Sequence, residues 1–428
     1  MASNTDIALR DSILYSIYVR SHTEEGTFLS IIPDLERIKA LGTDIIWFMP
    51  IHPIGVKNKK GSLGCPYANR DYRTVNPCYG TMEDFRKLVD AIHALGMKCM
   101  IDVVYNHTSP DATLVTEHPE FYYRKPDGSF GNKTGDWSDV IDLDYSNPAL
   151  WDYQIESLRQ WASLVDGFRC DVASFVPVDF WCRARAAVEE VHPGCIWLGE
   201  TVHTSFSVFN RICGYYTGTD SEMFNAFDME YDYDIRGVFD NYLAGKAPLS
   251  GWLEALNFQE SAYPDNYIKM RCLENHDQPR IASRILDEKA LRNFTALLYF
   301  LKGSTLLYAG QEYCDTHQPS LFEKETITRD ASKDISPYLI KLADIKKNVL
   351  SYADYFLAKA DDENNVAVLT RSDGHTKKIG VFSLSGKHNI VDVTVPDGTY
   401  TNLIDNEPVT VAGGKLACTC EPIIFTVK

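Results

Sequence analysis

The sequence predicts an α/β fold: a (β/α)8 TIM barrel with an inserted domain after strand three and a C-terminal antiparallel β-sandwich domain. Three observations lead to this prediction. Eight short apolar runs alternate with helical patterns, a long polar excursion follows the third run, and the end of the chain alternates short strands with turns. The expected boundaries are residues 1–104 and 148–356 for the barrel, 105–147 for the inserted domain and 357–428 for the sandwich.

The eight apolar runs have the length of buried strands. We expect them at residues 13–19, 44–49, 98–104, 167–171, 196–200, 223–229, 268–273 and 304–308. Eight strand–helix units favour a closed parallel barrel over an open, doubly wound sheet. An open sheet that binds nucleotides would usually show a glycine-rich GxGxxG loop after its first strand, and the segment IYVRSHTEEG has none.

Helical periodicity is clear between several of these runs. The segment MEDFRKLVDAIHALG follows a Gly80-Thr81 start signal and places Leu88 and Ile92 on one face. The segment ALWDYQIESLRQWA does the same with Leu150 and Leu158. Both patterns predict helices that pack one apolar face against the barrel.

The excursion at residues 105–147 contains the polar and aromatic stretch HPEFYYRKPDGSFGNKTGDW. Most loops between a strand and a helix of such a barrel run only about 2 to 6 residues, so a connection this long is typical of a functional lid or a small inserted domain. We expect it to wall one side of a cleft. Later in the chain, VAVLTRSDGH, KIGVFSLSGKH, NIVDVTVPDGTY and PIIFTVK read as strands of a separate all-β module.

The amino-acid composition is that of an ordinary globular protein with an excess of acidic residues. The chain has 428 residues, 45% of them hydrophobic, and a formal net charge of −17. That charge opposes binding to nucleic acid or to anionic membranes and suits a neutral, hydroxyl-rich substrate, although most of it is expected to lie on a solvated surface. Oligomeric state does not follow from the sequence.

The cysteines and the first residues of the chain indicate in which cellular compartment the protein resides. The eleven cysteines are an odd number, and Cys99, Cys170 and Cys272 lie inside expected strands, where a reduced buried thiol is usual. The start, MASNTDIALRDS, has no apolar stretch of signal-peptide length, and no segment approaches the ~20 apolar residues of a membrane span. We therefore expect a cytoplasmic protein, or a secreted one if a signal has been removed.

Three of the apolar runs end in a carboxylate. GFRCD ends at Asp171, IWLGE ends at Glu200, and MRCLENHD ends at Asp277. Barrel enzymes build their active sites at the carboxyl ends of the strands, so the three acids together predict one cleft. Taken singly, each would more often be a helix cap or a surface ion pair. Two carboxyl groups can divide the acid and nucleophile roles on a glycosidic bond, and a third can hold the substrate.

Four segments carry a family resemblance. DVVYNH (102–107), GFRCDVAS (167–174), LGETVH (198–203) and ENHDQPR (274–280) resemble, in order and approximate spacing, the signature segments of the α-amylase family of retaining, α-glucan-active enzymes. LGTDIIWFMPI (41–51), YANRDYRTVNPCYGT (67–81) and GSTLLYAGQE (303–312) also look like segments of that family. The resemblance spans most of residues 11–312 and implies a barrel, an insertion after strand three and a terminal β domain.

The resemblance implies a role for each acid: Asp171 as the nucleophile, Glu200 as the general acid/base and Asp277 as the transition-state stabiliser. Retaining glycosidases attack with one carboxylate while a second carboxyl group, about 5 Å away, protonates the leaving oxygen. Arg169, two residues before Asp171 on the same strand face, can hold the nucleophile ionised. Repulsion from the other two acids would help to keep Glu200 protonated.

Three further residues match positions that bind the reacting sugar in the family. The resemblance implies that His107 and His276 bind sugar hydroxyls and that the sugar stacks on Tyr67. Singly, each histidine would more often be a structural residue with its hydrogen bonds satisfied, and a loop tyrosine would more often be a packing residue.

Calcium is the one cofactor that the resemblance raises, and the chemistry itself requires none. Asn106 and Asp142 match positions that hold a structural calcium ion in many family members, and oxygen ligands suit that ion. Where many amylases carry Lys-His after the nucleophile segment, this chain has Ser174-Phe175, which removes one sugar contact and one calcium ligand. The alternative is that Asn106 and Asp142 hydrogen-bond the loop directly.

A second departure concerns the far wall of the cleft. Family exo-glucosidases carry an acidic residue directly after the stacking tyrosine, and here that residue is Ala68. This favours a cleft that accepts longer α-1,4-glucan chains. In contrast, ENHDQPR and the segment PSLFEKE (319–325) look like those of oligosaccharide-cleaving relatives.

The leading hypothesis is hydrolysis of α-1,4-glucosidic bonds in maltodextrin or starch-type α-glucans. A 4-α-glucanotransferase, or an oligosaccharide-cleaving α-glucosidase or maltogenic enzyme, is the alternative, decided by acceptor-side loops such as 314–336. A catalytically inactive carbohydrate-binding scaffold is the remote alternative. Such proteins typically lose one of the acids, whereas Asp171, Glu200 and Asp277 are all present.

Overall fold

The structure is a computed structural model that describes residues 4–133 and 137–428. The chain divides into two compact units. Of the described residues, the first unit comprises 4–6, 14–133, 137–234 and 318–327, and the second comprises 7–13, 235–317 and 328–428.

A closed barrel of parallel strands is the central element. Within the described residues its eight strands follow the order β1-β10-β9-β8-β7-β6-β3-β2. Their bounds are β1 Ile13–Ile17, β2 Ile45–Phe48, β3 Lys98–Val103, β6 Gly167–Cys170, β7 Ile196–Gly199, β8 Met229–Tyr231, β9 Lys269–Arg271 and β10 Ser304–Tyr308. The predicted (β/α)8 barrel is confirmed.

Burial explains why the barrel strands read as continuous apolar runs. Every residue of β1, β2 and β7 is buried, as expected where both faces of a parallel strand are covered. Register places Asp102 of β3 opposite Arg169 of β6, and Phe168 of β6 opposite Trp197 of β7. The register therefore sets one acid and one base side by side inside an apolar barrel.

The sixth predicted strand was wrong. Residues 223–229 were expected to be extended, but helix α9 occupies Asp220–Met223 and strand β8 begins only at Met229. The Thr219 side chain accepts a hydrogen bond from the Glu222 N–H, and the Glu222 carboxylate accepts one from the Thr219 N–H at 2.7 Å. This capping box starts a helical turn, so the apolar residues after it are buried in a turn instead of a strand.

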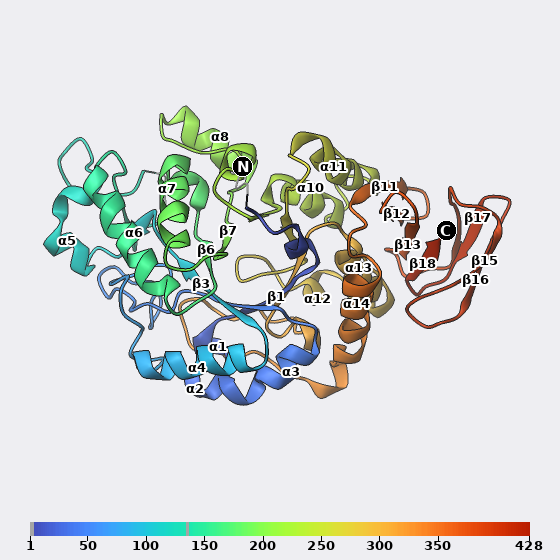
Figure 1. Cartoon of the computed structure of the whole chain (residues 1–428), viewed down its shortest axis with the longest axis horizontal. Helices are drawn as coiled ribbons and strands as arrows, with labels where there is room; N and C mark the ends of the chain where they lie inside the picture. Colours follow the sequence, from blue (N-terminus) through green and yellow to red (C-terminus); the bar gives the residue numbers. More distant parts are fainter. Residues whose placement is uncertain (1–3, 134–136) are drawn as a thin grey trace. The chain divides into compact units, whose positions relative to one another are not determined.

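Helices of the first unit connect its strands. They are α1 Val19–His22, α2 Phe28–Ile31, α3 Leu35–Ala40, α4 Met82–Ala94, α5 Thr113–Glu117, α6 Pro148–Ala162, α7 Val178–Glu189, α8 Thr204–Ile212 and α9. The two helices with clear sequence periodicity, α4 and α6, are confirmed. Thr81 caps α4 and Asn147 caps α6, and α6 packs beside α7 (Figure 1).

The excursion after β3 has secondary structure of its own. It pairs the short strands β4 His107–Thr108 and β5 Ile141–Asp142 antiparallel, with His107 opposite Asp142. Helix α5 and a 3-10 turn at Pro119–Phe121 lie between them in the chain. Other 3-10 turns are Ile7–Asp11, Ile32–Asp34, Ala173–Phe175, Gln311–Tyr313 and Ala331–Lys333. The domain boundaries proposed above stay predictions.

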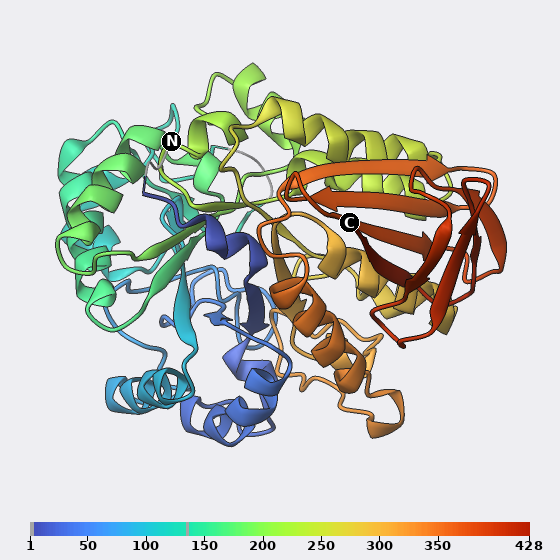
Figure 2. The same cartoon turned by 45° about the vertical axis from the view of Figure 1, so that its right-hand side comes forward.

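Among the described residues, the second unit has four α-helices that lie wholly within it. They are α11 Leu249–Ala262, α12 Ile281–Arg284, α13 Glu288–Phe300 and α14 Ser336–Asn348; helix α10, Tyr233–Leu243, begins in the first unit. Two of the four, α11 and α13, pack against the C-terminal strands of the second unit. The Asn293 side chain of α13 accepts the Ser383 N–H at 2.8 Å, and the Phe300 ring lies 5.7 Å from that of Phe382. Polar and apolar contacts thus fix α13 on the C-terminal module (Figure 2).

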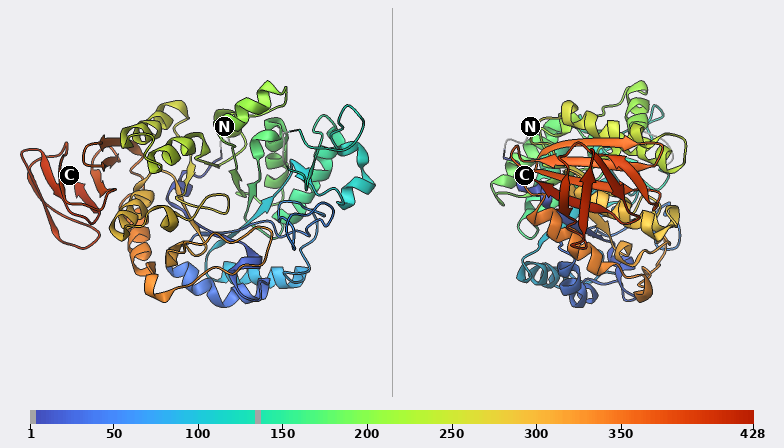
Figure 3. Two further views of the ribbon diagram at one scale, coloured as in Figure 1. Left: turned by 180° about the vertical axis from the view of Figure 1, so that it is seen from behind. Right: turned by 90° about the vertical axis from the view of Figure 1, so that its right-hand side faces the viewer.

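The C-terminal strands form two antiparallel sheets. Their bounds are β11 Tyr355–Asp361, β12 Val366–Ser372, β13 Lys377–Ser383, β14 Asn389–Asp392, β15 Gly398–Thr401, β16 Pro408–Ala412, β17 Lys415–Cys418 and β18 Ile423–Val427. Among the described residues the orders are β11-β12-β13-β18 and β14-β17-β16-β15 (Figure 3). Val381 and Phe425 of the first sheet share one core with Val411 and Leu416 of the second, which confirms the predicted sandwich.

The eleven cysteines, all within the described part of the chain, are free thiols. Burial raises the pKa of the Cys99 and Cys170 thiols well above the usual value, so both are protonated, unreactive core residues.

None of the helices in residues 4–133 and 137–428 is long and apolar enough to cross a membrane.

Candidate active site

Asp171 directly follows strand β6 and contacts the arginine two residues before it. Arg169 and Asp171 lie on the same face because side chains alternate along a strand. Arg169 Nη1 donates a hydrogen bond to Asp171 Oδ1 at 2.8 Å, and the arginine is fully buried. The structure thus brings two of the predicted site residues together.

Glu200 directly follows strand β7 and contacts the same guanidinium. Its Oε2 lies 2.8 Å from Arg169 Nη2 and accepts the N–H of Val172 at 2.8 Å. Asp171 is 7% exposed and Glu200 is 6% exposed. One guanidinium therefore holds both carboxyl groups through different nitrogens, and its charge favours the carboxylate form of each.

The residue after Asp171 has an unusual backbone conformation. Val172 has φ +37°, in the left-handed region that β-branched residues rarely adopt. In this conformation its N–H donates to Glu200 Oε2. The strained peptide helps to fix the position of Glu200 relative to Asp171.

Asp102 is a site residue that the sequence reasoning missed. It is fully buried on β3, and its two oxygens each accept from Arg169 Nη1 at 2.9 Å. Oδ2 also accepts the hydroxyl of Tyr67 at 3.0 Å, which fixes the predicted stacking ring. A charged residue inside the apolar run KCMIDVV is the sequence signal that could have identified it.

Arg169 lies in an aromatic cage. Its guanidinium carbon is 5.2 Å from the ring centre of Trp47, 5.6 Å from that of Tyr67 and 5.3 Å from that of Tyr231. Its Nε donates to the Tyr231 hydroxyl at 3.1 Å. Burial alone would lower the pKa of Arg169, but the carboxylates of Asp102 and Glu200 raise it well above its usual value, so the cation is permanent.

His107 lies beside Asp171. Its Nε2 is 4.0 Å from Asp171 Oδ2, and its Nδ1 accepts from Asn106 Nδ2 at 3.1 Å. Burial lowers the pKa of His107, so the ring is neutral and its proton lies on Nε2. A neutral N–H at this place can donate to a hydroxyl group of a bound sugar.

His276 and Asp277 belong to the second unit, in the segment after β9. His276 is buried, and its Nε2 lies 3.1 Å from Asp277 Oδ2. The Asp277 N–H donates to Asn275 Oδ1 at 2.9 Å. The side chain of Asp277 is 41% exposed. Among these carboxylates, Asp277 is the one most open to solvent.

Glu274 supports this segment and was not singled out from the sequence. It is 1% exposed, its Oε1 accepts from Arg280 Nη1 at 2.7 Å, and its Oε2 accepts the Ile281 N–H at 2.6 Å. The Glu274–Arg280 ion pair joins the first and last residues of the segment ENHDQPR and so fixes the backbone that carries His276 and Asp277.

The residues proposed for calcium are engaged with protein groups. Asn106 Nδ2 donates to Asp142 Oδ1 at 3.5 Å, and the Lys133 N–H donates to Asp142 Oδ2 at 2.6 Å. Lys133 Nζ donates to the Leu143 carbonyl at 3.0 Å. Calcium takes six to eight oxygen ligands. Within the described chain no group of three His, Cys, Asp or Glu residues could hold a metal ion. These donors do not fit a calcium site, and they match the alternative in which the pair hydrogen-bonds the loop.

The three residues that depart from the family pattern, Ser174, Phe175 and Ala68, are buried. Ser174 is fully buried, and its Oγ accepts the Val202 N–H at 3.3 Å. Phe175, 8% exposed, packs against Val172 and Val202. Ala68 is 2% exposed. None of the three adds a charge beside the acids.

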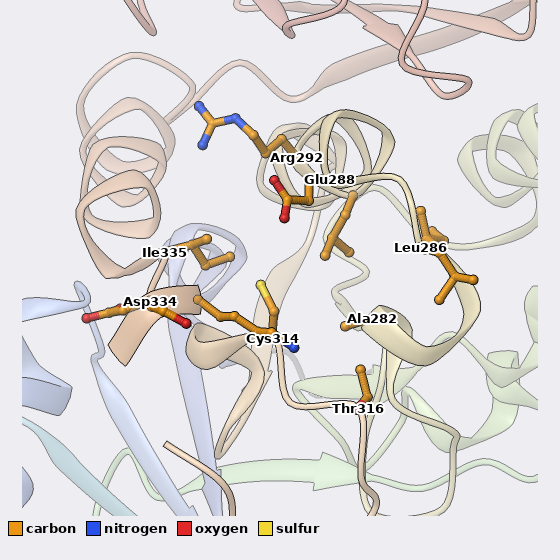
Figure 4. A pocket seen from close by; sticks show the side chains of 12 residues that line it. Ala282, Leu286, Glu288, Arg292, Cys314, Thr316, Asp334 and Ile335 are labelled. Atoms are coloured by element: carbon orange, nitrogen blue, oxygen red, sulfur yellow. The ribbon is translucent and has the colours of Figure 1, made fainter. Parts of the chain in front are cut away.

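A separate cavity in the second unit has a volume of about 350 Å³ (Figure 4). Cys314, Ile335 and Glu288 are among its lining residues, and none of the residues that line it is aromatic. Burial raises the pKa of the Cys314 thiol to about 11, so this thiol is not a nucleophile at neutral pH. The cavity thus lacks a stacking ring for a sugar, and its thiol is unreactive.

Comparison with known proteins decides the family. Residues 14–137 and 133–352 match the family model described as the α-amylase catalytic domain, and residues 358–425 match the bacterial α-amylase C-terminal domain. The chain belongs to the α-amylase family. The predicted resemblance is therefore confirmed, and the α-amylase family includes both glycoside hydrolases and glycosyltransferring enzymes.

Two solved structures in the family cover nearly the whole chain. An α-amylase from Lactobacillus plantarum is 42% identical, covers 99% of this chain and 100% of its own, and superposes with a TM-score of 0.95. A noncanonic maltogenic α-amylase from Thermotoga neapolitana is 33% identical, with 98% and 99% coverage and a TM-score of 0.86. An α-amylase from Haloarcula japonica is 28% identical over 71% of this chain, and the match spans 44% of that relative.

Proposed function

We propose that the protein is a retaining glycosidase that hydrolyses α-1,4-glucosidic bonds in maltodextrin or starch-type α-glucans. The observation that carries this proposal is the Arg169 guanidinium, which lies 2.8 Å from Asp171 Oδ1 and 2.8 Å from Glu200 Oε2. Two carboxyl groups that share one guanidinium lie close enough to act on one glycosidic bond. The likeness to the α-amylase from Lactobacillus plantarum over its full length supports this activity.

In the first half-reaction Asp171 is the nucleophile and Glu200 is the acid. An Asp171 oxygen bonds to the anomeric carbon, the glycosidic bond breaks, and the Glu200 proton goes to the leaving oxygen. Arg169 positions Asp171 and favours its ionised form, and Asp102 in turn holds Arg169 in place. The contacts of Glu200 favour its carboxylate, so the reacting form is the one in which Glu200 has taken up a proton.

In the second half-reaction Glu200 is the base. It takes a proton from water, the water oxygen bonds to the anomeric carbon, and Asp171 leaves as a carboxylate. The chain then returns to its starting protonation state. Carboxyl groups supply all of this chemistry, so we propose that it needs no cofactor.

The remaining predicted residues are proposed to bind the reacting sugar. Neutral His107 donates from Nε2, and Tyr67, fixed through its hydroxyl by Asp102, stacks on the ring. His276 and Asp277 lie in the segment that follows β9, and their match to the family segment supports a hydroxyl-binding role for His276 and a stabilising role for Asp277. Buried Ala68 leaves no carboxylate after Tyr67, which supports a site that accepts longer glucans.

The second candidate function is that of a maltogenic amylase, which forms short products. The noncanonic maltogenic α-amylase from Thermotoga neapolitana is 33% identical over 98% of this chain. A maltogenic enzyme and an endo-acting amylase use the same acids and differ in where the cleft ends, so the product pattern separates them.

The test is a time course of maltoheptaose digestion followed by chromatography. Wild type should give mixed short products, and Glu200→Gln, Asp171→Asn and Asp277→Asn should each lose at least about 1,000-fold in rate. Glu83→Gln changes an exposed glutamate of α4 and is the matched control that should cleave normally. Cleavage by Glu200→Gln at the wild-type rate would contradict the assignment, and accumulation of maltose alone would favour the maltogenic reading.

A further inference from the structure

A lysine and a cysteine that are far apart in the sequence are in contact within the second unit. Lys289 lies in the first turn of α13, and its Nζ donates to Cys420 Sγ at 2.8 Å. Cys420 lies in the segment between β17 and β18, and the two residues are 131 positions apart in the chain. Neither of them belongs to the proposed active site, so the contact calls for an explanation of its own.

The backbones of the two residues are held side by side by one buried amide. Asn293 Nδ2 donates to the Lys289 carbonyl at 2.8 Å and to the Cys420 carbonyl at 2.9 Å, and Asn293 is fully buried. Next to it, Arg292 Nε donates to Glu421 Oε2 at 2.9 Å. The contact between nitrogen and sulfur therefore starts from two backbones whose separation is fixed.

The pair is accessible to reagents in solution. The Lys289 side chain is exposed, and Cys420 is a partly exposed free thiol. Reactive cysteines in proteins are partly exposed and lie beside a cation, and Cys420 meets both conditions. The hydrogen bond to Cys420 raises the pKa of Lys289, and the carboxylates of Glu421 and Asp287 also raise it. Since the reduced sulfur is the largest cause, oxidation of the sulfur makes the neutral amine easier to form.

A second cysteine lies close by in the sequence, in a different environment. Cys418, the last residue of β17, is 2% exposed and belongs to the core between the two C-terminal sheets. Burial raises the pKa of its thiol to about 11, and its Sγ donates to the Thr419 carbonyl at 3.5 Å. The group that contacts the Cys420 sulfur at 2.8 Å is the Lys289 amine.

We propose that Lys289 and Cys420 form a modification site at which hydrogen peroxide makes a covalent cross-link. The Cys420 thiolate attacks the peroxide, the O–O bond breaks, and the sulfur becomes a sulfenic acid while the other oxygen takes up protons and leaves as water. The neutral Lys289 amine then attacks the sulfur, the S–O bond breaks, and a second water leaves. The sulfur loses two electrons, the peroxide gains them, and the product is a sulfenamide with a bond between Nζ and Sγ.

The cross-link would join α13 covalently to the C-terminal strands. Cross-links between distant positions stabilise a fold because they restrict the unfolded chain, and the effect grows with the length of the loop that they close. The oxidised second unit should therefore resist unfolding better than the reduced one. The acids Asp171 and Glu200 are not altered by this reaction.

The test treats the full chain with hydrogen peroxide, digests it without reductant and maps the peptides by mass spectrometry. The peptide that contains Lys289 should be joined to the one that contains Cys420, with a mass equal to their sum less two hydrogens. The melting temperature of the undigested sample should rise by at least about 3 °C. Dithiothreitol should reverse both changes, because it reduces the bond between nitrogen and sulfur.

Two variants remove one partner each. Lys289→Arg keeps the positive charge but has no amine nucleophile, and Cys420→Ser removes the sulfur, so peroxide should produce neither the cross-link nor the rise in melting temperature. Cys78→Ser changes an exposed cysteine of the first unit and is the matched control, which should behave as wild type.

Oxidation of Cys420 to a sulfinic or sulfonic acid, or to a disulfide with Cys418, while Lys289 stays free would overturn the inference. The same holds if peroxide oxidises Cys78 and leaves Cys420 reduced, or if the rise in melting temperature persists in Lys289→Arg. None of these results depends on glucan cleavage, so they are independent of the proposed function.

Discussion

Arg169 Nη1 lies 2.8 Å from Asp171 Oδ1, and the arginine side chain is fully buried. The same nitrogen contacts both oxygens of Asp102, and the second terminal nitrogen contacts Glu200. One guanidinium therefore contacts three carboxyl groups in the part of the chain that carries the proposed chemistry. Removing one partner of a buried ion pair typically lowers the free energy of unfolding by about 3–5 kcal/mol, because the remaining charge is left uncompensated.

Arg169→Lys should lower kcat at least about 100-fold and should also lower the melting temperature. Lysine keeps the positive charge, but its single ammonium nitrogen cannot contact three carboxyl groups as the two terminal nitrogens of the planar guanidinium do. Arg159→Lys is the control, since Arg159 forms an exposed pair with Glu190 at 2.9 Å. Equal kinetics in the two variants, measured with maltoheptaose, would mean that the shared guanidinium has no catalytic importance.

Asp102→Asn should lower kcat/KM about 10- to 100-fold, because it weakens charged hydrogen bonds to Arg169 and to the Tyr67 hydroxyl. Tyr67→Phe removes only the second of these bonds and should have the smaller effect. Steady-state kinetics on maltoheptaose measure both. A larger loss in Tyr67→Phe than in Asp102→Asn would contradict the contact pattern.

The buried histidine His52 predicts a pH dependence of stability. Burial lowers its pKa to about 4, and its Nδ1 contacts the Thr74 carbonyl at 2.9 Å. The unfolded chain binds the proton near pH 6.5 and the folded chain only near pH 4, so stability from neutral His52 is complete above about pH 6.5 and is lost as pH falls toward 4.

Urea unfolding of wild type and His52→Gln at pH 7 and pH 4.5 measures this effect. The stability advantage of wild type over the variant should shrink by about 2–3 kcal/mol at the lower pH. An advantage that stays constant between the two pH values would show that His52 has an ordinary pKa.

Chelation should leave the protein unchanged. Asn106, Asp142 and Lys133 satisfy one another and the loop directly, so EDTA should shift the melting temperature of wild type by less than about 1 °C. Lys133→Met removes the bond from Nζ to the Leu143 carbonyl and should lower the melting temperature, whereas the exposed Lys87→Met should not. A large drop with EDTA that calcium reverses would establish a metal site here.

The barrel was predictable where sequence periodicity and burial agree. The apolar runs at β2, β3, β6 and β7 have every or nearly every residue buried, so composition alone identified them. The run at 223–229 failed because the Thr219–Glu222 capping box, a local signal, overrides the strand tendency of the apolar residues after it.

The site was predictable in part for a similar reason. Asp171 and Glu200 stand at strand ends, where a charged residue interrupts an apolar run. Asp102 lies inside its strand, and its importance follows from the register that sets it opposite Arg169, which only the sheet reveals. The buried cluster of Val172, Phe175 and Val202, against which Phe206 packs, joins separate segments of the chain, so no local sequence pattern indicates it.

Trapping of the glycosyl-enzyme tests the central claim most directly. Glu200→Gln incubated with α-maltosyl fluoride should form the intermediate, because fluoride leaves without an acid, and should hydrolyse it slowly, because the base is missing. Mass spectrometry of the digested protein should then locate one maltosyl group on Asp171, in the peptide that contains GFRCD. A maltosyl group on Asp102 or Asp277, or fluoride release at the wild-type rate with no labelled peptide, would contradict the account.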